Sequence, residues 1–159
     1  MGLCESMVGR GLFLGIPVYS PEGVNLSPFT AENIGAVGVD ICDVARIQEA
    51  IERRPLYTKL TFTPKEIAYC DRASGDLRAQ RYATRFAAKE AVAKALGGMP
   101  YRYTDIGVVN EENGKPQVEL RGKAKEYSER IGVRTIHLSL AHIRETAIAF
   151  SIAIRQTSS

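Results

Sequence analysis

The stretch RFAAKEAVAKALGG, residues 85–98, contains two groups that can do chemistry: the carboxylate of Glu90 and the ammonium group of Lys94. They are four residues apart, so on a helix they lie on one face. Tyr82 and Phe86 precede them on that face, and the carboxylate interrupts a stripe that begins with aromatic side chains. On spacing alone, the better explanation is an exposed ion pair between Glu90 and Lys94, worth roughly a few tenths of a kcal/mol. The alternative is a carboxylate that works on a bound ligand.

A second carboxylate lies in AVGVDIC, residues 36–42, which alternates branched apolar residues with Gly38, Asp40 and Cys42. This alternation predicts a strand with Asp40 on the side opposite the branched residues. Taken alone, Asp40 is a polar residue on the open face of an edge strand. If Asp40 and Glu90 act together, the end of this strand must pack against the helix that carries Glu90.

Further elements must position these groups, and capping residues and glycines mark their ends. Asp43 is a candidate N-cap for a helix over residues 43–54, and Thr63-Pro64-Lys65-Glu66 has the pattern of a capping box. The other expected elements are a helix over 77–96 that stops at Gly97, a hairpin over 104–121 that turns at Asn113-Gly114, a helix over 122–131 and strands over 136–141 and 145–155. In the last strand, large apolar residues alternate with small ones that let a helix pack closely. The pattern predicts an α+β fold in which an antiparallel sheet packs against helices.

Length and composition fit a single soluble domain, since the chain has 159 residues, of which 45% are hydrophobic and 25% charged. We expect residues 1–34, rich in proline and glycine, to be an N-terminal extension of unknown role, and residues 35–159 to be the domain. The apolar run at 11–19 is too short to span a membrane, so no membrane partner is expected. Three cysteines without a CxxC pair support neither a disulfide framework nor a zinc site, and they indicate a reducing cytoplasm.

The charge of the chain is mildly positive. Its formal net charge is +3, and the first 32 residues hold one arginine against three glutamates, so the positive charge lies in the domain. This balance favours an acidic partner or a phosphorylated ligand. A nucleic-acid partner is not expected, because the sequence has no stacking-aromatic motif and no dense basic stripe.

Five blocks of the sequence, taken in order, resemble one known family. They are VGVDICDVARIQ, FTPKEIAYC, RFAAKEAVAKALG, NGKPQVEL and HLSLAH. Together they cover about residues 35–155, and they are similar to the holo-[acyl-carrier-protein] synthases, the short bacterial type of 4'-phosphopantetheinyl transferase. The resemblance implies an enzyme that moves the 4'-phosphopantetheine arm of coenzyme A to a serine of apo acyl carrier protein. It also implies release of adenosine 3',5'-bisphosphate and a requirement for Mg2+.

The resemblance further implies roles for single residues. Asp40 and Glu90 match the metal carboxylates of the family, and Mg2+ prefers such hard oxygen ligands. Glu90, or a water that it holds, is the best candidate to take the serine proton. Lys94 matches the lysine that faces the phosphates of coenzyme A. The other candidate coenzyme A residues are Arg85, Asn113, Gly114, Lys115, Pro116, Ser139 and His142.

Alternatives stay open for some of these residues. Arg85 and Lys89 flank the helical stripe, and a merely solvated side chain explains either of them. His142 is equally well explained as an ordinary histidine at a strand end. The family often reads Ser-Leu-Ser-His here, whereas residues 139–142 read Ser-Leu-Ala-His, so a hydroxyl contact at position 141 is absent.

The resemblance also implies an acidic protein partner, since acyl carrier proteins are strongly acidic. Arg46, Arg53 and Arg54, with Lys59 in the following turn, are the candidate docking residues, although a solvated helix face explains the same charges. A homotrimer with sites at subunit boundaries follows from the resemblance only. The sequence leaves open whether the carrier serves fatty-acid, polyketide or peptide synthesis. A non-catalytic module that binds coenzyme A or a carrier protein is the main alternative to an enzyme.

Overall fold

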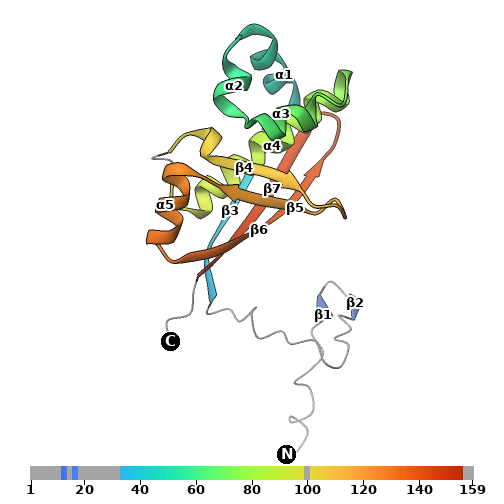
Figure 1. The fold of residues 1–159 in the computed structure, drawn as a ribbon. Coiled ribbons are helices and arrows are strands. Elements are labelled where there is room, and N and C mark those ends of the chain that lie inside the picture. Colours follow the sequence, from blue (N-terminus) through green and yellow to red (C-terminus); the bar gives the residue numbers. More distant parts are fainter. Residues whose placement is uncertain (1–11, 14–15, 18–32, 99–100, 156–159) are drawn as a thin grey trace, which may run out of the picture. The chain divides into compact units, whose positions relative to one another are not determined.

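A computed structural model describes residues 12–13, 16–17, 33–98 and 101–155 (Figure 1). The chain divides into two units, residues 1–30 and residues 31–159. In the first unit, β1 (Leu12–Phe13) and β2 (Ile16–Pro17) form a short antiparallel pair. Most of the predicted extension lies outside the described residues, so its assignment as a separate segment stays a prediction.

The second unit contains the α+β fold that the sequence predicts. Its antiparallel sheet has the strand order β3-β7-β6, and β4 and β5 form a separate antiparallel hairpin. The elements are β3 (Ile34–Asp43), α1 (Val44–Arg53), α2 (Tyr57–Thr61), α3 (Pro64–Cys70), α4 (Gly75–Ala95), the 3-10 helix η3 (Tyr103–Asp105), β4 (Ile106–Asn110), β5 (Pro116–Leu120), α5 (Gly122–Arg130), β6 (Val133–His142) and β7 (Thr146–Arg155).

The predicted helix ends are confirmed by their caps. The side chain of Asp43 accepts a hydrogen bond of 2.8 Å from the backbone N–H of Arg46 at the start of α1. Thr63 and Glu66 form the reciprocal capping box of α3, and α4 is followed by Gly97 with a φ of 88°. The short helix α2 was not predicted, because no side-chain cap marks its start.

Helix α4 packs directly on the sheet, because the residues between them are small (Figure 1). A Cβ atom at Gly38 of β3 would lie 1.9 Å from the carbonyl oxygen of Ala91 on α4. The buried hydroxyl of Ser151 on β7 donates a 2.9 Å hydrogen bond to the same carbonyl. Ala147 and Ala149 of β7 are fully buried in the same cluster as the alanines of α4. The predicted role of the small residues of β7 in close helix packing is confirmed.

The opposite face of the sheet carries large apolar side chains that are exposed in this chain. They are Val37 and Val39 (both 56% exposed), Ile41 (67%), Ile148 (42%) and Phe150 (42%). Asp40 lies opposite this branched face of β3, as predicted, but the expectation that its own side of the strand is open is wrong. The helix covers the side with Gly38 and Asp40, because only small residues allow its backbone to come so close.

The core has two clusters, one on each part of α4. The first joins α4 to α1 and α3 through residues such as Tyr82, Ile47 and Cys70. The second joins α4 to the β4–β5 hairpin and α5 through Val92, Ile106 and Ala124. Within the described residues, no helix is long and apolar enough to cross a membrane.

Candidate functional site

The stripe of four side chains on α4, from Tyr82 to Lys94, runs from the core to the surface. Tyr82 is fully buried, Phe86 and Glu90 are half-buried, and Lys94 is exposed. The helix is 21 residues long and leaves the core cluster around Tyr82 before it ends. Its geometry therefore delivers Glu90 and Lys94 to the boundary between protein and solvent.

Glu90 is held by Tyr103, a residue that was not among the predicted site residues. The hydroxyl of Tyr103 in η3 donates a short hydrogen bond to Oε1 of Glu90. The ring of Tyr103 stacks on Phe86, with the centroids 5.6 Å apart and the planes at 27°. Burial, followed by the hydrogen bond to Glu90, raises the pKa of Tyr103, so the phenol stays protonated and remains a donor. The contact between Tyr103 and Glu90 forms only when the chain folds, so no local pattern in the sequence indicates it.

Lys94 pairs with Asp40 and not with Glu90. Its Nζ lies 2.9 Å from Oδ1 of Asp40 and donates a second 2.9 Å hydrogen bond to the carbonyl of Val39. The exposed Glu90–Lys94 pair that the spacing favours is absent from the ion pairs of the described residues, so that expectation is wrong. The reason is that β3 crosses α4 at this turn and offers Lys94 two oxygens that the isolated helix lacks.

The two candidate metal carboxylates are therefore brought to one region. Asp40 meets Lys94, one turn beyond Glu90 on α4, and its charge also acts on the phenol of Tyr103 that binds Glu90. The described part of the chain holds no group of three or more His, Cys, Asp and Glu residues suited to a metal. Two carboxylates nevertheless fit Mg2+, which commonly takes one or two protein carboxylates and completes its octahedron with phosphate oxygens and water. The ammonium group of Lys94 already pairs with Asp40, so the position beside this carboxylate favours a positive charge.

Lys89 is completely buried, so a solvated side chain is the wrong explanation for it. Its Nζ lies 2.8 Å from Oε2 of Glu66, whose side chain is equally buried, and it donates to the carbonyls of Tyr103 and Ile106. Burial lowers the pKa of Lys89, while Glu66 opposes that shift. The capping-box pattern predicts the role of Glu66 at the start of α3, but it does not indicate the ion pair with Lys89.

Arg85 is also buried, with 3% of its surface exposed. One terminal nitrogen donates to the side-chain oxygen of Asn110 at 2.5 Å, and the guanidinium carbon lies 4.5 Å from the ring centroid of Tyr69. Nε of Arg85 is buried and has no hydrogen-bond partner among the described residues. Arg85 lines a cavity of about 340 Å³. An anion in this cavity would lie beside a guanidinium group whose hydrogen bonds are only partly satisfied.

This Arg85 cavity collects several, but not all, of the candidate coenzyme A residues. Arg85, Gly114, Pro116, Ser139 and His142 all line it. Two other candidates, Asn113 and Lys115, do not line this cavity. Lys94 does not line it either and pairs with Asp40.

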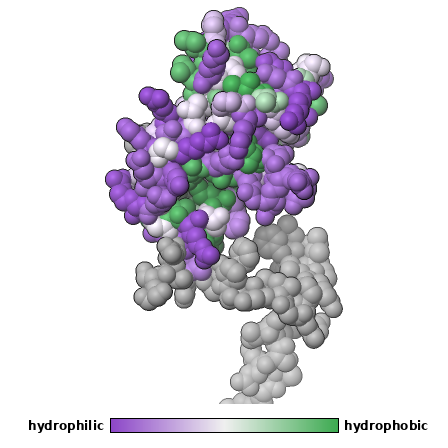
Figure 2. Space-filling view, in the orientation of Figure 1, coloured by the Kyte–Doolittle hydropathy of each residue, from purple (hydrophilic) through white to green (hydrophobic). Residues whose placement is uncertain are grey.

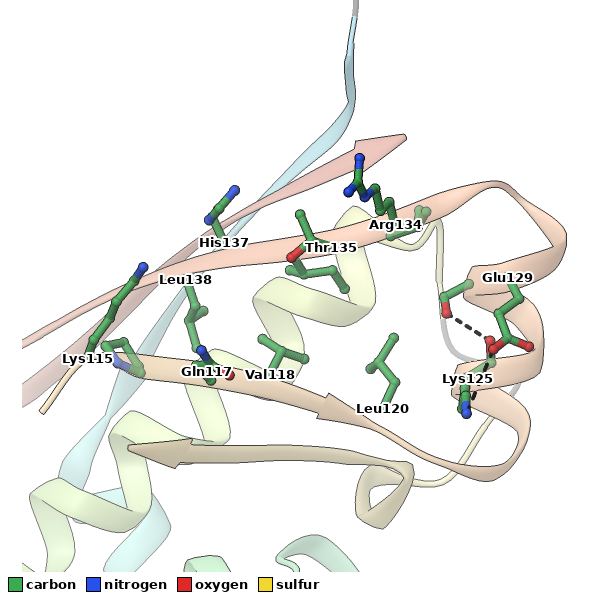
Figure 3. Close-up of a pocket in the computed structure, with 14 residues that line it drawn as sticks. Lys115, Gln117, Val118, Leu120, Lys125, Glu129, Arg134, Thr135, His137 and Leu138 are labelled. Atoms are coloured by element: carbon green, nitrogen blue, oxygen red, sulfur yellow. Dashed lines mark hydrogen bonds and ion pairs between the residues drawn. The ribbon is translucent and has the colours of Figure 1, made fainter. Parts of the chain in front are cut away.

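Asn113 and Lys115 are the candidates that the structure separates from the Arg85 cavity. The side chain of Asn113 accepts a 2.8 Å hydrogen bond from the backbone N–H of Lys115 and so stabilises the hairpin turn. Lys115 lines a different groove, of about 380 Å³, between β5, β6 and α5 (Figure 3). Figure 3 shows Val118, Leu120 and Leu138 among its apolar lining residues.

The three candidate docking arginines share one cavity. Arg46, Arg53 and Arg54 line a space of about 470 Å³ between α1, α2 and α4 whose apolar wall includes Ile47, Tyr57, Phe86 and Tyr103. The guanidinium of Arg46 lies 5.8 Å from the ring centroid of Phe86. Figure 2 shows hydrophobic residues among hydrophilic ones at this end of the molecule. The cavity therefore combines apolar residues with three basic ones and one acidic one, Glu49, and it reaches Tyr103, the partner of Glu90.

Comparison with known proteins gives one consistent result. Residues 36–151 match the model of the 4'-phosphopantetheinyl transferase superfamily. A holo-[acyl-carrier-protein] synthase of Clostridium tetani is 46% identical over 118 residues, which cover 73% of this chain and 92% of that protein. The crystal structure of the holo-ACP-synthase of Plasmodium yoelii superimposes with a TM-score of 0.70 at 32% identity and covers 78% of this chain and 97% of that one.

A further solved structure contains the ligand expected from the sequence. The holo-[acyl-carrier-protein] synthase of Helicobacter pylori, in complex with coenzyme A, has a TM-score of 0.64 at 26% identity and covers 74% of this chain and 98% of its own. The sequence blocks, the fold and these relatives agree. The chain therefore belongs to the 4'-phosphopantetheinyl transferase superfamily and is an enzyme of its holo-[acyl-carrier-protein] synthase branch.

Proposed function

We propose that this enzyme transfers the 4'-phosphopantetheine arm of coenzyme A to a serine of apo acyl carrier protein, depends on Mg2+ and releases adenosine 3',5'-bisphosphate. The observations that support the proposal are the pairing of Lys94 with Asp40 one helical turn beyond Glu90, and the contact of Glu90 with Tyr103, which lines the cavity of the three arginines. The comparisons support the reaction, because the relatives are holo-[acyl-carrier-protein] synthases and one of them binds coenzyme A.

Asp40 and Glu90 would hold Mg2+, and Lys94 would face the phosphates. When bound, the ion neutralises charge on the pyrophosphate of coenzyme A. Lys94 would be released from Asp40 if the ion took its place, and its flexible side chain would then offer its charge to a phosphate oxygen.

In the transfer step, the serine oxygen of the carrier attacks the β-phosphorus, which carries the pantetheine arm. A new P–O bond forms as the bond to the bridging oxygen breaks, and adenosine 3',5'-bisphosphate departs with that oxygen. Glu90, or a water that it holds, accepts the serine proton. Lys94 stabilises the charge that grows on the leaving group.

The Arg85 cavity is the proposed site for an anionic part of coenzyme A. Its buried guanidinium has an unpartnered Nε, and charge-assisted hydrogen bonds to phosphate are among the stronger ones. Gly114, Ser139 and His142 complete the wall. Asn113 contributes through the turn that it stabilises, and Lys115 is left without a role at this cavity.

The arginine cavity beside α1 is the proposed docking site of the carrier. Its rim of Arg46, Arg53 and Arg54 complements an acidic surface and would accelerate association. Arg53 is already paired with Glu49 at 2.8 Å in an exposed contact, so it is the weakest of the three candidates. The contact between this cavity and Tyr103 would place a docked serine close to Glu90.

The apolar outer face of the sheet supports the proposed homotrimer. Val37, Val39, Ile41, Ile148 and Phe150 form a row across two neighbouring strands, and soluble proteins rarely leave such a row uncovered. Replacement of Val39 by glutamate should give a monomer in light scattering. A variant that keeps the mass of the unmodified protein would refute this interface.

Cys42 and Cys70 are buried free thiols, which suits the proposed cytoplasmic location.

The central test is transfer itself. The protein is mixed with coenzyme A, Mg2+ and apo acyl carrier protein, and the carrier is weighed by mass spectrometry. We expect the added mass of one phosphopantetheine, and the proposal fails if none of several carriers gains it. Excess EDTA should stop the transfer, since both proposed metal ligands are carboxylates. Activity that survives EDTA would contradict the assignment of Asp40 and Glu90.

A Glu90→Gln variant separates the enzyme from a binding module. It should stay folded, because Glu90 is half-buried and its replacement can still accept a hydrogen bond from Tyr103. We expect it to bind coenzyme A and to lose transfer. A variant that transfers like the unmodified protein would remove Glu90 from the mechanism.

A further inference from the structure

Tyr103 lies between the docking cavity and Glu90, and its surroundings leave it little freedom. Its backbone carbonyl accepts a 3.0 Å hydrogen bond from the buried Nζ of Lys89, and its ring stacks on Phe86. Lys89 and Phe86 belong to the same helix as Glu90. The helix therefore fixes the carbonyl and the ring of the tyrosine whose hydroxyl binds its own carboxylate.

The support extends into the core behind the site. Lys89 is paired with Glu66, whose carboxylate also accepts the backbone N–H groups of Thr63 at 2.8 Å and Val108 at 3.0 Å. Glu66 thereby ties α3 and β4 to the ammonium that holds Tyr103. Through the ammonium of Lys89, this network fixes the backbone carbonyl of Tyr103 and so the place of its phenol.

We propose that Tyr103 is a positioning residue that occupies Oε1 of Glu90 and so leaves Oε2 directed to the metal and the serine proton. This inference rests on the proposed function, because it assigns a task to Glu90 in that reaction. A half-buried carboxylate on a helix otherwise has several rotamers, and a fixed donor selects among them. Groups that orient a metal ligand in this way commonly contribute about 10–100-fold to metal affinity or activity.

The variant that isolates the hydroxyl is Tyr103→Phe, which keeps the ring and its stacking on Phe86. Its matched control is Tyr101→Phe, because the buried hydroxyl of Tyr101 has no hydrogen-bond partner in the described part of the chain and Tyr101 does not line the docking cavity. Both variants lose the same atom, two residues apart. Only one of them loses a contact with Glu90.

The experiment measures Mn2+ binding to each protein by electron paramagnetic resonance, with coenzyme A present and no carrier. It also measures kcat and the KM for carrier with Mg2+. We expect Tyr103→Phe to weaken Mn2+ binding at least about tenfold and to lower kcat by a similar factor, while the KM for carrier stays unchanged. Tyr101→Phe should match the unmodified protein in all three quantities.

Several results would overturn the inference. One is unchanged Mn2+ affinity in Tyr103→Phe, and another is an equal loss in both variants, which would indicate packing. A rise in the KM for carrier alone would make Tyr103 a docking residue, because it also lines that cavity. If the unmodified protein transfers nothing, the proposed function fails, but the comparison of Mn2+ affinities still decides whether Tyr103 positions Glu90. An unmodified protein that binds no Mn2+ defeats the inference as well.

Discussion

Replacement of Lys89 by methionine tests the buried ion pair that supports the site. The side chains of Lys89 and Glu66 are both 0% exposed and lie 2.8 Å apart. Methionine fills most of the space of the lysine stem but brings no charge and no donor. The substitution therefore leaves the carboxylate of Glu66 without its counter-ion, and it removes a donor from the carbonyls of Tyr103 and Ile106.

The expected loss of stability is large. Removal of one partner from a buried pair costs about 3–5 kcal/mol, because an uncompensated charge remains in the interior. Glu66 keeps two backbone N–H donors, from Thr63 and Val108, which places the expected loss near the lower end of that range. Since a domain has roughly 5–15 kcal/mol in total, the variant should lose a substantial part of its stability.

Urea denaturation followed by circular dichroism measures this loss. The control is Lys65→Met, which removes a 2.8 Å ion pair with Glu119 whose lysine is 62% exposed, and it should cost less than about 1 kcal/mol. A double variant, Glu66→Gln with Lys89→Met, should recover part of the loss because no buried charge is left alone. If Lys89→Met is no more destabilised than Lys65→Met, the argument for a buried pair is refuted.

Three further predictions concern packing and ionisation. Gly38→Ala would place a Cβ atom 1.9 Å from the backbone oxygen of Ala91, so β3 must move by about 1 Å and carry Asp40 with it; we expect about 100-fold less transfer activity. Gly35→Ala is its control in the same strand, because the atoms it would meet belong to the flexible side chain of Arg155, and equal losses in both variants would exclude the close contact as the cause. Ser151→Ala should cost about 1 kcal/mol in urea denaturation, since a buried hydrogen bond to Ala91 is lost, and a more stable variant would contradict this. In an alkaline titration of phenolate absorbance, Tyr57, Tyr82, Tyr101 and Tyr103 should ionise late, because burial raises each pKa, that of Tyr101 to about 12. The protonated tyrosines contribute their full stabilisation below the ordinary pKa of 10.0, and this stabilisation is lost as the pH rises through their folded-state pKa values. Ionisation of all seven tyrosines near pH 10 in the folded protein would contradict the structure.

Local signals in the sequence determined most of the elements of this protein. The N-cap at Asp43, the capping box at Thr63, Gly97 after the long helix and the Asn113-Gly114 turn all act over a few neighbouring residues, and the structure has each of them. The alternation of small and large residues in β7 also indicated where a helix packs. These features are legible because their physical causes, backbone conformation and side-chain period, are local.

Only part of the candidate site could be predicted from the sequence. The resemblance of five blocks selected Asp40, Glu90 and Lys94, and the structure brings Lys94 to Asp40 and gives Glu90 a different partner. Spacing on one helix favoured a pair between Glu90 and Lys94, because it contains no information on the strand that crosses the helix. Lys89 reads as a surface lysine for the same reason.

The sequence by itself thus determined the fold class, the ends of the main elements and, through motif resemblance, the family. Only the tertiary structure decided which side of β3 meets α4, which charges are buried and which group holds Glu90. The physical reason is that burial and pairing depend on contacts between residues far apart in the chain, such as Glu66 with Lys89 and Asp40 with Lys94. Such contacts leave no periodic trace in the sequence of either partner.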